Sequence, residues 1–151
     1  MKRTFFSLAL LLAVATLTAQ TKMTAREAAV KIADRILAST TYEFKNTKTG
    51  EIYKSVKKLP LDMDVKVACK YNNWHYTNGV TNMALMELGD KLGDKKYEKY
   101  VLKNMNFVFN EGNLDFFRKQ YDEAFKRDGW NAVRKLSWHM IFRGKRLDDN
   151  G

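Results

Sequence analysis

Residues 79–110 read GVTNMALMELGDKLGDKKYEKYVLKNMNFVFN, and this stretch decides the fold. Apolar side chains recur three or four residues apart on both sides of Gly93, which is typical of amphipathic helices. The first apolar stripe is Val80, Ala84, Leu85, Leu88 and Leu92, and the second is Tyr97, Val101, Met105 and Val108. Glycine suits the left-handed position that ends a helix. Two helices joined by so short a turn run antiparallel, so the segment predicts an αα-hairpin.

Three further helices are expected, one before this hairpin and two after it. Thr24 and Glu27 have the spacing of a capping box and predict a helix that ends near Ala38. Its apolar rows are Ala28, Ile32 and Ile36, and Ala29, Ala33 and Leu37. The two later helices are expected over 114–126, with Phe117, Tyr121 and Phe125 four residues apart, and over 130–142, with Val133, Leu136, Met140 and Ile141.

Residues 40–73 carry no comparable helical pattern. They contain Pro60, the only proline of the chain, and a turn signal that ends at Gly50. We expect an irregular stretch here, in which Tyr53 and Val65–Val67 are candidates for extended backbone. A long loop of this kind often carries function. Five helices and no convincing sheet predict an all-α fold.

The N-terminus predicts export. Lys2 and Arg3 precede a nearly unbroken apolar run from Phe5 to Leu17, and Ala19 supplies a small residue for cleavage. These are the three parts of a secretory signal peptide, here residues 1–19, and the run is too short to span a bilayer. The alternative is an uncleaved anchor or a buried N-terminal helix. We expect the mature protein in the periplasm or outside the cell, without a membrane association after cleavage.

The charge of the mature chain favours an anionic partner. Loss of Lys2 and Arg3 with the leader lowers the Lys and Arg count from 27 to 25 and leaves 17 Asp and Glu, so the net charge falls from +10 to +8. A basic surface attracts polyanions. An exported protein meets little nucleic acid, so an acidic polysaccharide matches the compartment better. A basic surface that serves solubility alone is the plain alternative.

Few residues are available for disulfide or metal chemistry. Cys69 is the only cysteine, so no intramolecular disulfide can form, and it is expected to be an ordinary packed residue. His75 and His139 are the only histidines and are expected to be structural. Without a cluster of ligands at helical spacing, we predict neither a metal site nor a cofactor.

Three short motifs follow one another along the mature chain. The first is Trp74-His75-Tyr76-Thr77-Asn78-Gly79, the second is Leu92-Gly93-Asp94-Lys95-Lys96-Tyr97, and the third is Leu147-Asp148-Asp149-Asn150-Gly151. In this order they resemble the opening part of glycoside hydrolase family 105, the unsaturated rhamnogalacturonyl hydrolases, and of the related family 88 of unsaturated glucuronyl hydrolases. The resemblance covers about residues 24–151.

The resemblance implies an (α/α)6 barrel of six helical hairpins, of which residues 20–151 form the first part. It also implies hydration of the C4=C5 bond of Δ4,5-unsaturated uronyl oligosaccharides derived from pectin, in which an aspartic acid protonates the alkene and helps to activate water. Asp149, or Asp148 if the register slips, matches the first active-site aspartate. Tyr76 matches an aromatic that contacts substrate, and Trp74 is a second candidate. No metal or other cofactor is required by this chemistry.

Each of these assignments has a structural alternative. Trp74 and Tyr76 could pack against the first helix, since aromatic residues are usually core. Asp148 and Asp149 could cap a following helix.

The resemblance places the second aspartate after the third motif, where this sequence ends, and a ring of twelve helices needs more than 132 residues. We therefore expect a truncated form that is inactive as it stands, and the alternative is that a partner supplies the rest of the barrel. The alternative function is a secreted basic helical module that binds acidic oligosaccharide or a protein partner without turnover. The oligomeric state is not indicated by the sequence.

Overall fold

The computed structural model describes residues 23–143 of the chain. The chain divides into two units, residues 1–31 and residues 32–151, and each is described by itself. The predicted signal peptide and the aspartates Asp148 and Asp149 lie outside the described residues. Among the residues that are described, no helix is long and apolar enough to cross a membrane.

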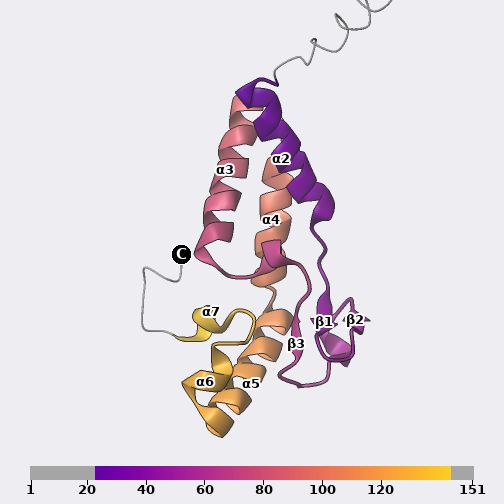
Figure 1. Cartoon of the computed structure of the whole chain (residues 1–151), viewed down its shortest axis with the longest axis vertical. Helices are drawn as coiled ribbons and strands as arrows, with labels where there is room; N and C mark the ends of the chain where they lie inside the picture. Colours follow the sequence, from indigo (N-terminus) through magenta and orange to yellow (C-terminus); the bar gives the residue numbers. More distant parts are fainter. Residues whose placement is uncertain (1–22, 144–151) are drawn as a thin grey trace, which may run out of the picture. The chain divides into compact units, whose positions relative to one another are not determined.

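The described elements are mostly helical, as predicted, with a small sheet added (Figure 1). In chain order they are α2 (Ala25–Ser39), β1 (Phe44–Asn46), β2 (Ile52–Tyr53), the 3₁₀ helix η1 (Val56–Lys58), β3 (Val65–Val67), the 3₁₀ helix η2 (Lys70–Asn72), α3 (Tyr76–Leu92), α4 (Lys96–Val108), α5 (Glu111–Asp128), α6 (Trp130–Val133) and α7 (His139–Arg143).

The capping box at the start of α2 is confirmed. The backbone N–H of Thr24 donates to the Glu27 carboxylate at 2.8 Å, and the N–H of Glu27 donates to the Thr24 hydroxyl oxygen at 3.2 Å. The hydrogen bond from the Thr24 backbone lowers the pKa of Glu27. Two of the free N–H groups at the helix start are therefore satisfied by this pair.

The αα-hairpin of α3 and α4 is confirmed, and the two helices lie side by side in Figure 1. Gly93 has φ 67°, and the N–H groups of Gly93 and Asp94 donate to the carbonyls of Asp90 and Gly89. These two bonds form a Schellman motif, which ends α3. The predicted stripe of α4 is buried or partly buried. On α3, however, Val80 and Ala84 are exposed, because the buried face turns toward Asn82, Leu85 and Gly89.

The second half of α2 packs on this hairpin. Ala33 is buried in a cluster with Leu85, Tyr97, Tyr100 and Val101, and Ile36 and Leu37 pack against it. The prediction for Ile32 was wrong, since its side chain is 63% exposed. The row through Ala33 and Leu37 therefore faces the core, and the row through Ile32 lies at its margin.

The expectation of no sheet was wrong. Residues 44–67 form a three-stranded antiparallel sheet in the order β2-β1-β3, with Phe44 opposite Tyr53 on one side and Val67 on the other. The extended backbone predicted for Tyr53 and Val65–Val67 is confirmed, and the central strand was missed. Phe44 is buried beside Val108, Phe117 and Trp138, which anchors the strand on the helices.

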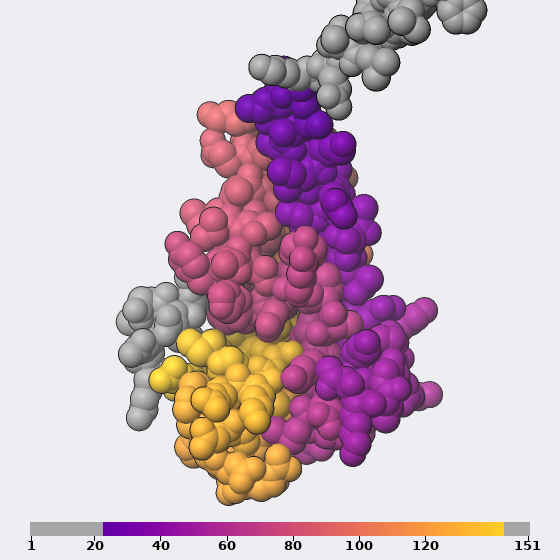
Figure 2. Space-filling model, in the orientation of Figure 1, coloured from indigo at the N-terminus to yellow at the C-terminus, as the bar shows by residue number. Residues whose placement is uncertain are grey.

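The C-terminal part differs from the prediction in two respects. The buried face of α5 is Asn113, Phe117, Gln120 and Ala124, which leaves Phe125 exposed and stacked on Tyr121. The helix expected over 130–142 is two short helices, α6 and α7. Trp138 interrupts them with a left-handed backbone, φ 58°, and an almost fully buried indole ring. Between α6 and α7, the hydroxyl oxygen of Ser137 accepts from the N–H of Val67 in β3 at 3.1 Å. The space-filling view shows the yellow C-terminal residues of the described chain beside magenta segments (Figure 2).

Candidate functional site

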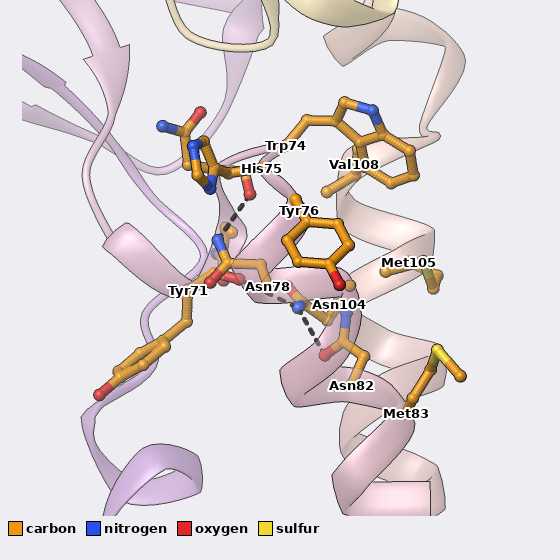
Figure 3. A pocket seen from close by; sticks show the side chains of 13 residues that line it. Tyr71, Trp74, His75, Tyr76, Asn78, Asn82, Met83, Asn104, Met105 and Val108 are labelled. Carbon is orange, nitrogen blue, oxygen red and sulfur yellow. Dashed lines mark hydrogen bonds between the residues drawn. The ribbon is translucent and has the colours of Figure 1, made fainter. Parts of the chain in front are cut away.

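The start of α3 forms one wall of a cavity of about 210 Å³ (Figure 3). The segment from η2 to the helix start supplies Tyr71, Asn72, Asn73, Trp74, His75 and Tyr76; α3 supplies Asn78, Gly79, Asn82 and Met83; and α4 supplies Asn104, Met105 and Val108. The lining thus includes every residue of the Trp74–Gly79 motif except Thr77. We call it the Asn-aromatic pocket.

Local hydrogen bonds hold the motif in place. His75 is the N-cap of α3, and its Nδ1 accepts from the N–H of Thr77 at 3.4 Å. The side-chain amide of Asn78 donates to the backbone carbonyls of Lys70 and Asn73, at 2.8 Å and 2.6 Å. These bonds join the first turn of α3 to η2, so the residues between them are positioned by both elements. The structural role expected for His75 is confirmed by its cap.

The two aromatic candidates have different environments. Trp74 is partly buried, meets Phe109 edge to face at a centroid distance of 5.1 Å, and packs against the cluster around Phe44. It therefore belongs partly to the core, although its partners are on neither α2 nor α3. Tyr76 is the first residue of α3 and is 70% exposed at the pocket (Figure 3). Trp74 is therefore packed against the cluster around Phe44 and not against the first helix, and Tyr76 is exposed and not packed.

Three asparagines at the base of the pocket were not singled out from the sequence. Asn72 and Asn104 are each 1% exposed, and Asn82 is 7% exposed. The Asn72 amide donates to the carbonyl of Thr41, and the Asn104 amide donates to the carbonyl of Tyr71 and to Oδ1 of Asn82. A signal was present only for Asn104, which falls within the predicted apolar stripe of its helix, whereas Asn82 lies off the stripe predicted for α3.

Two of these side chains have an unused acceptor. Oδ1 of Asn72 and Oδ1 of Asn104 are buried and have no hydrogen-bond partner in the described structure. The orientation of both amides is fixed, since a flip would turn Oδ1 toward the carbonyl oxygen that the amide nitrogen now meets. A buried acceptor without a donor costs free energy, and both oxygens are closed off from the open part of the pocket, so this cost falls on the fold.

The described lining carries no fixed charge. None of the thirteen lining residues is Asp, Glu, Lys or Arg. Over residues 23–143 no group of three His, Cys, Asp or Glu side chains could hold a metal ion. His139 lies elsewhere, with Nδ1 2.8 Å from the carbonyl oxygen of Leu136 and its ring against Trp130, and Cys69 is buried as expected.

The described residues bring Trp74 and Tyr76 together at one cavity, and they do not include Asp148 and Asp149. Comparison of the chain with protein-family models, curated proteins and solved structures gives no match. The resemblance to the unsaturated uronyl hydrolases therefore stays a prediction from the three motifs.

Proposed function

We propose that this protein binds a sugar ring of an acidic, pectin-derived oligosaccharide in the Asn-aromatic pocket, as part of an unsaturated uronyl hydrolase of the (α/α)6 type. The observation that carries the proposal is the arrangement of Tyr76 and Trp74 at one cavity whose lining also includes the side chains of Asn73 and Asn78. The α3–α4 hairpin and the packed second half of α2 suit the helical-hairpin architecture, and export suits a polysaccharide substrate.

The chemistry of the pocket matches a sugar. A pyranose ring has an apolar face, which an aromatic ring covers, and a rim of hydroxyls, which donate and accept hydrogen bonds. Tyr76 offers an exposed aromatic surface to such a ring. Asn73 and Asn78 add polar lining nearer the helix start.

Turnover requires a carboxyl group. Protonation of the enol-ether carbon needs an acid held in place beside the alkene. The candidates are Asp149 and Asp148, outside the described residues, and the described lining offers no carboxyl group of its own. In this proposal the pocket binds the sugar, and Asp149 supplies the first of the two acids.

The second candidate function is binding without turnover. It is favoured by the described lining, which has amides and aromatic rings and no carboxyl group. The two functions share the same pocket and differ in whether the C4=C5 bond is consumed.

A binding experiment tests the shared part. The exported chain is titrated with unsaturated digalacturonate by calorimetry, and Tyr76→Ala is expected to weaken binding by ~1–3 kcal/mol, the range for truncation of a contacting aromatic. Tyr76→Phe should keep most of the affinity. Phe125→Ala is the matched control, because Phe125 is an exposed helical aromatic, 53% exposed, that does not line the pocket. Equal affinities for wild type and Tyr76→Ala would remove Tyr76 from the site.

Turnover is measured on the same samples. The C4=C5 bond conjugated with the carboxylate absorbs in the ultraviolet, and hydration removes the signal. Loss of absorbance that Asp149→Asn abolishes, with binding retained, supports the hydrolase. Tight binding with constant absorbance supports binding without turnover in this chain, which agrees both with the inactivity expected from the sequence and with the second candidate function. The absence of both binding and turnover contradicts the proposal.

A further inference from the structure

A second cavity, of about 470 Å³, lies on another side of α4. It is lined by Tyr42, Phe44, Lys54, Ser55, Val56, Lys57, Lys103, Asn106, Phe107, Asn110, Gly112 and Asn113. Three of these residues are lysines, and none is Asp or Glu. We call this cavity the lysine pocket.

The charge of the lysine pocket is not neutralised within the described chain. Lys54, Lys57 and Lys103 are exposed, and no carboxylate of residues 23–143 lies within 4.0 Å of their ammonium nitrogens. The ammonium of Lys103 lies 4.3 Å from the centre of the Tyr42 ring, a cation–π contact that holds it at the wall. The positive field of the three lysines is therefore available to a ligand.

The start of α5 lies at the same cavity. Asn110 is its N-cap, and Asn110, Gly112 and Asn113 all line the wall. The Asn110 side chain accepts from the N–H of Asn113 at 3.2 Å, so the remaining N–H groups of the first turn and the dipole of this helix of 18 residues are what favour an anion. Glu111 belongs to this turn and does not line the cavity. Lysine charge and helix dipole thus act in the same direction.

The rest of the lining suits a ring. Tyr42, Phe44 and Phe107 give the cavity an aromatic side, with Phe44 and Phe107 stacked at a centroid distance of 5.3 Å. Asn106 and Ser55 add neutral polar groups. The volume is within the range of small-molecule sites, so it accepts a monosaccharide and not only a bare ion.

We propose that the lysine pocket is an anion site that binds a sugar-sized ligand through its carboxylate, sulfate or phosphate group. The site is separate from the proposed sugar site. Asn104, Met105 and Val108 face the Asn-aromatic pocket, whereas Lys103, Asn106 and Phe107 face the lysine pocket. At 100° per residue these two sets point to roughly opposite sides of α4, so one ring cannot occupy both.

The experiment is a titration of the ¹⁵N-labelled protein at low ionic strength. The probes are sodium galacturonate, sodium sulfate, sodium phosphate and neutral galactose. Saturable shifts of the Gly112 and Asn113 amide signals are expected with the anions and not with galactose. Galacturonate that binds more tightly than sulfate and phosphate identifies a carboxylated sugar as the ligand. Equal affinities for all three anions identify recognition of the anionic group itself.

Charge variants locate the site. Lys103→Gln and the double change Lys54→Gln with Lys57→Gln are each expected to weaken anion binding roughly tenfold, as loss of a charge-assisted contact does. Lys119→Gln removes one charge from an exposed position on α5 outside the cavity and should leave affinity unchanged. Tyr76→Ala should also have no effect, which separates this site from the proposed function.

Two outcomes would overturn the proposal. One is an equal loss of affinity in Lys119→Gln and Lys103→Gln, which would assign the effect to overall charge. The other is a shift that grows without saturation and spreads over all lysine-rich surfaces. Both are read from folded protein, since the amide spectrum reports folding directly.

Discussion

The indole Nε1–H of Trp138 donates a hydrogen bond of 2.8 Å to the backbone carbonyl of Asn72. Both residues are 1% exposed, and they are 66 residues apart in the sequence. Asn72 lines the Asn-aromatic pocket, and Trp138 joins the short helices α6 and α7. The bond therefore connects the C-terminal part of the described chain to the base of the candidate site.

Trp138→Phe is expected to destabilise the protein. The substitution leaves the buried carbonyl of Asn72 without its donor, which costs ~1–3 kcal/mol, and the smaller ring adds a void. Urea unfolding followed by circular dichroism measures the change. The control is Trp130→Phe, because Trp130 is 37% exposed and its ring contacts with His139 and Arg143 can be kept by phenylalanine. Comparable losses in the two variants would show that the hydrogen bond is not what stabilises this region.

Two glycines in α3 should respond to alanine with opposite signs. A Cβ at Gly89 would lie 3.2 Å from the backbone oxygen of Asp94 and 3.4 Å from Cβ of Tyr97, where α3 and α4 approach closely. Overpacking of this kind costs ~1–3 kcal/mol, which exceeds the gain in helix propensity. A Cβ at Gly79 meets nothing within 4 Å, so Gly79→Ala should stabilise by about 0.5–1 kcal/mol.

Thermal unfolding of both glycine variants tests this contrast. The Tm is expected to fall for Gly89→Ala and to rise for Gly79→Ala. A rise of the Tm in both variants would mean that α3 and α4 move apart to accommodate a methyl group at Gly89. The close packing at Gly89 would then not stabilise the fold.

The hairpin of α3 and α4 and the start of α2 were predictable because their signals are local. The stripe of α4, the Schellman glycine at 93 and the capping box at Thr24 each act within one or two turns of helix. The central strand was not predictable in this way. Phe44 becomes a strand residue through pairing with Val67 and burial against Phe117, both far away in the sequence.

The break at Trp138 has a similar cause. The apolar spacing of Val133, Leu136 and Met140 predicts one helix, yet the chain leaves helical geometry so that the indole can reach the carbonyl of Asn72. A long-range hydrogen bond thus overrides a local preference.

The sequence analysis named the two aromatic residues of the candidate site and did not name its buried asparagines. Trp74 and Tyr76 were named from the motif, and the structure places both at one cavity. Asn72 and Asn104 donate hydrogen bonds to backbone carbonyls of distant segments, and these partners cannot be predicted from the local sequence. An asparagine on a predicted apolar helical face was the available signal, and only Asn104 carries it.

Tyr42 and Tyr100 form a matched pair for a test of buried hydroxyls. The hydroxyl of Tyr42 is buried and has no hydrogen-bond partner among the described residues, whereas the hydroxyl of Tyr100 lies 3.0 Å from Oγ1 of Thr40. Burial raises the pKa of Tyr42 to about 12, and burial also raises the pKa of Tyr100. The two phenols thus share a buried environment and differ in their hydrogen bonding.

Tyr42→Phe should stabilise the protein by about 1 kcal/mol, because it removes an unpaired buried polar group while the ring keeps its edge contact with Phe107. Tyr100→Phe should destabilise it by about 1 kcal/mol, since the hydrogen bond between Tyr100 and Thr40 is lost and the Thr40 hydroxyl keeps only its bond to the carbonyl of Ile36. A folded pKa above the unfolded value of about 10 means that protons bind the folded state more tightly, so the linked stability is present below pH ~10 and is lost as the pH rises toward 12. Urea unfolding from pH 7 to pH 11 measures this loss, which should be smaller in Tyr42→Phe than in wild type. Destabilisation by Tyr42→Phe at pH 7 would contradict the argument, because it would show that the Tyr42 hydroxyl has a partner that the fold requires.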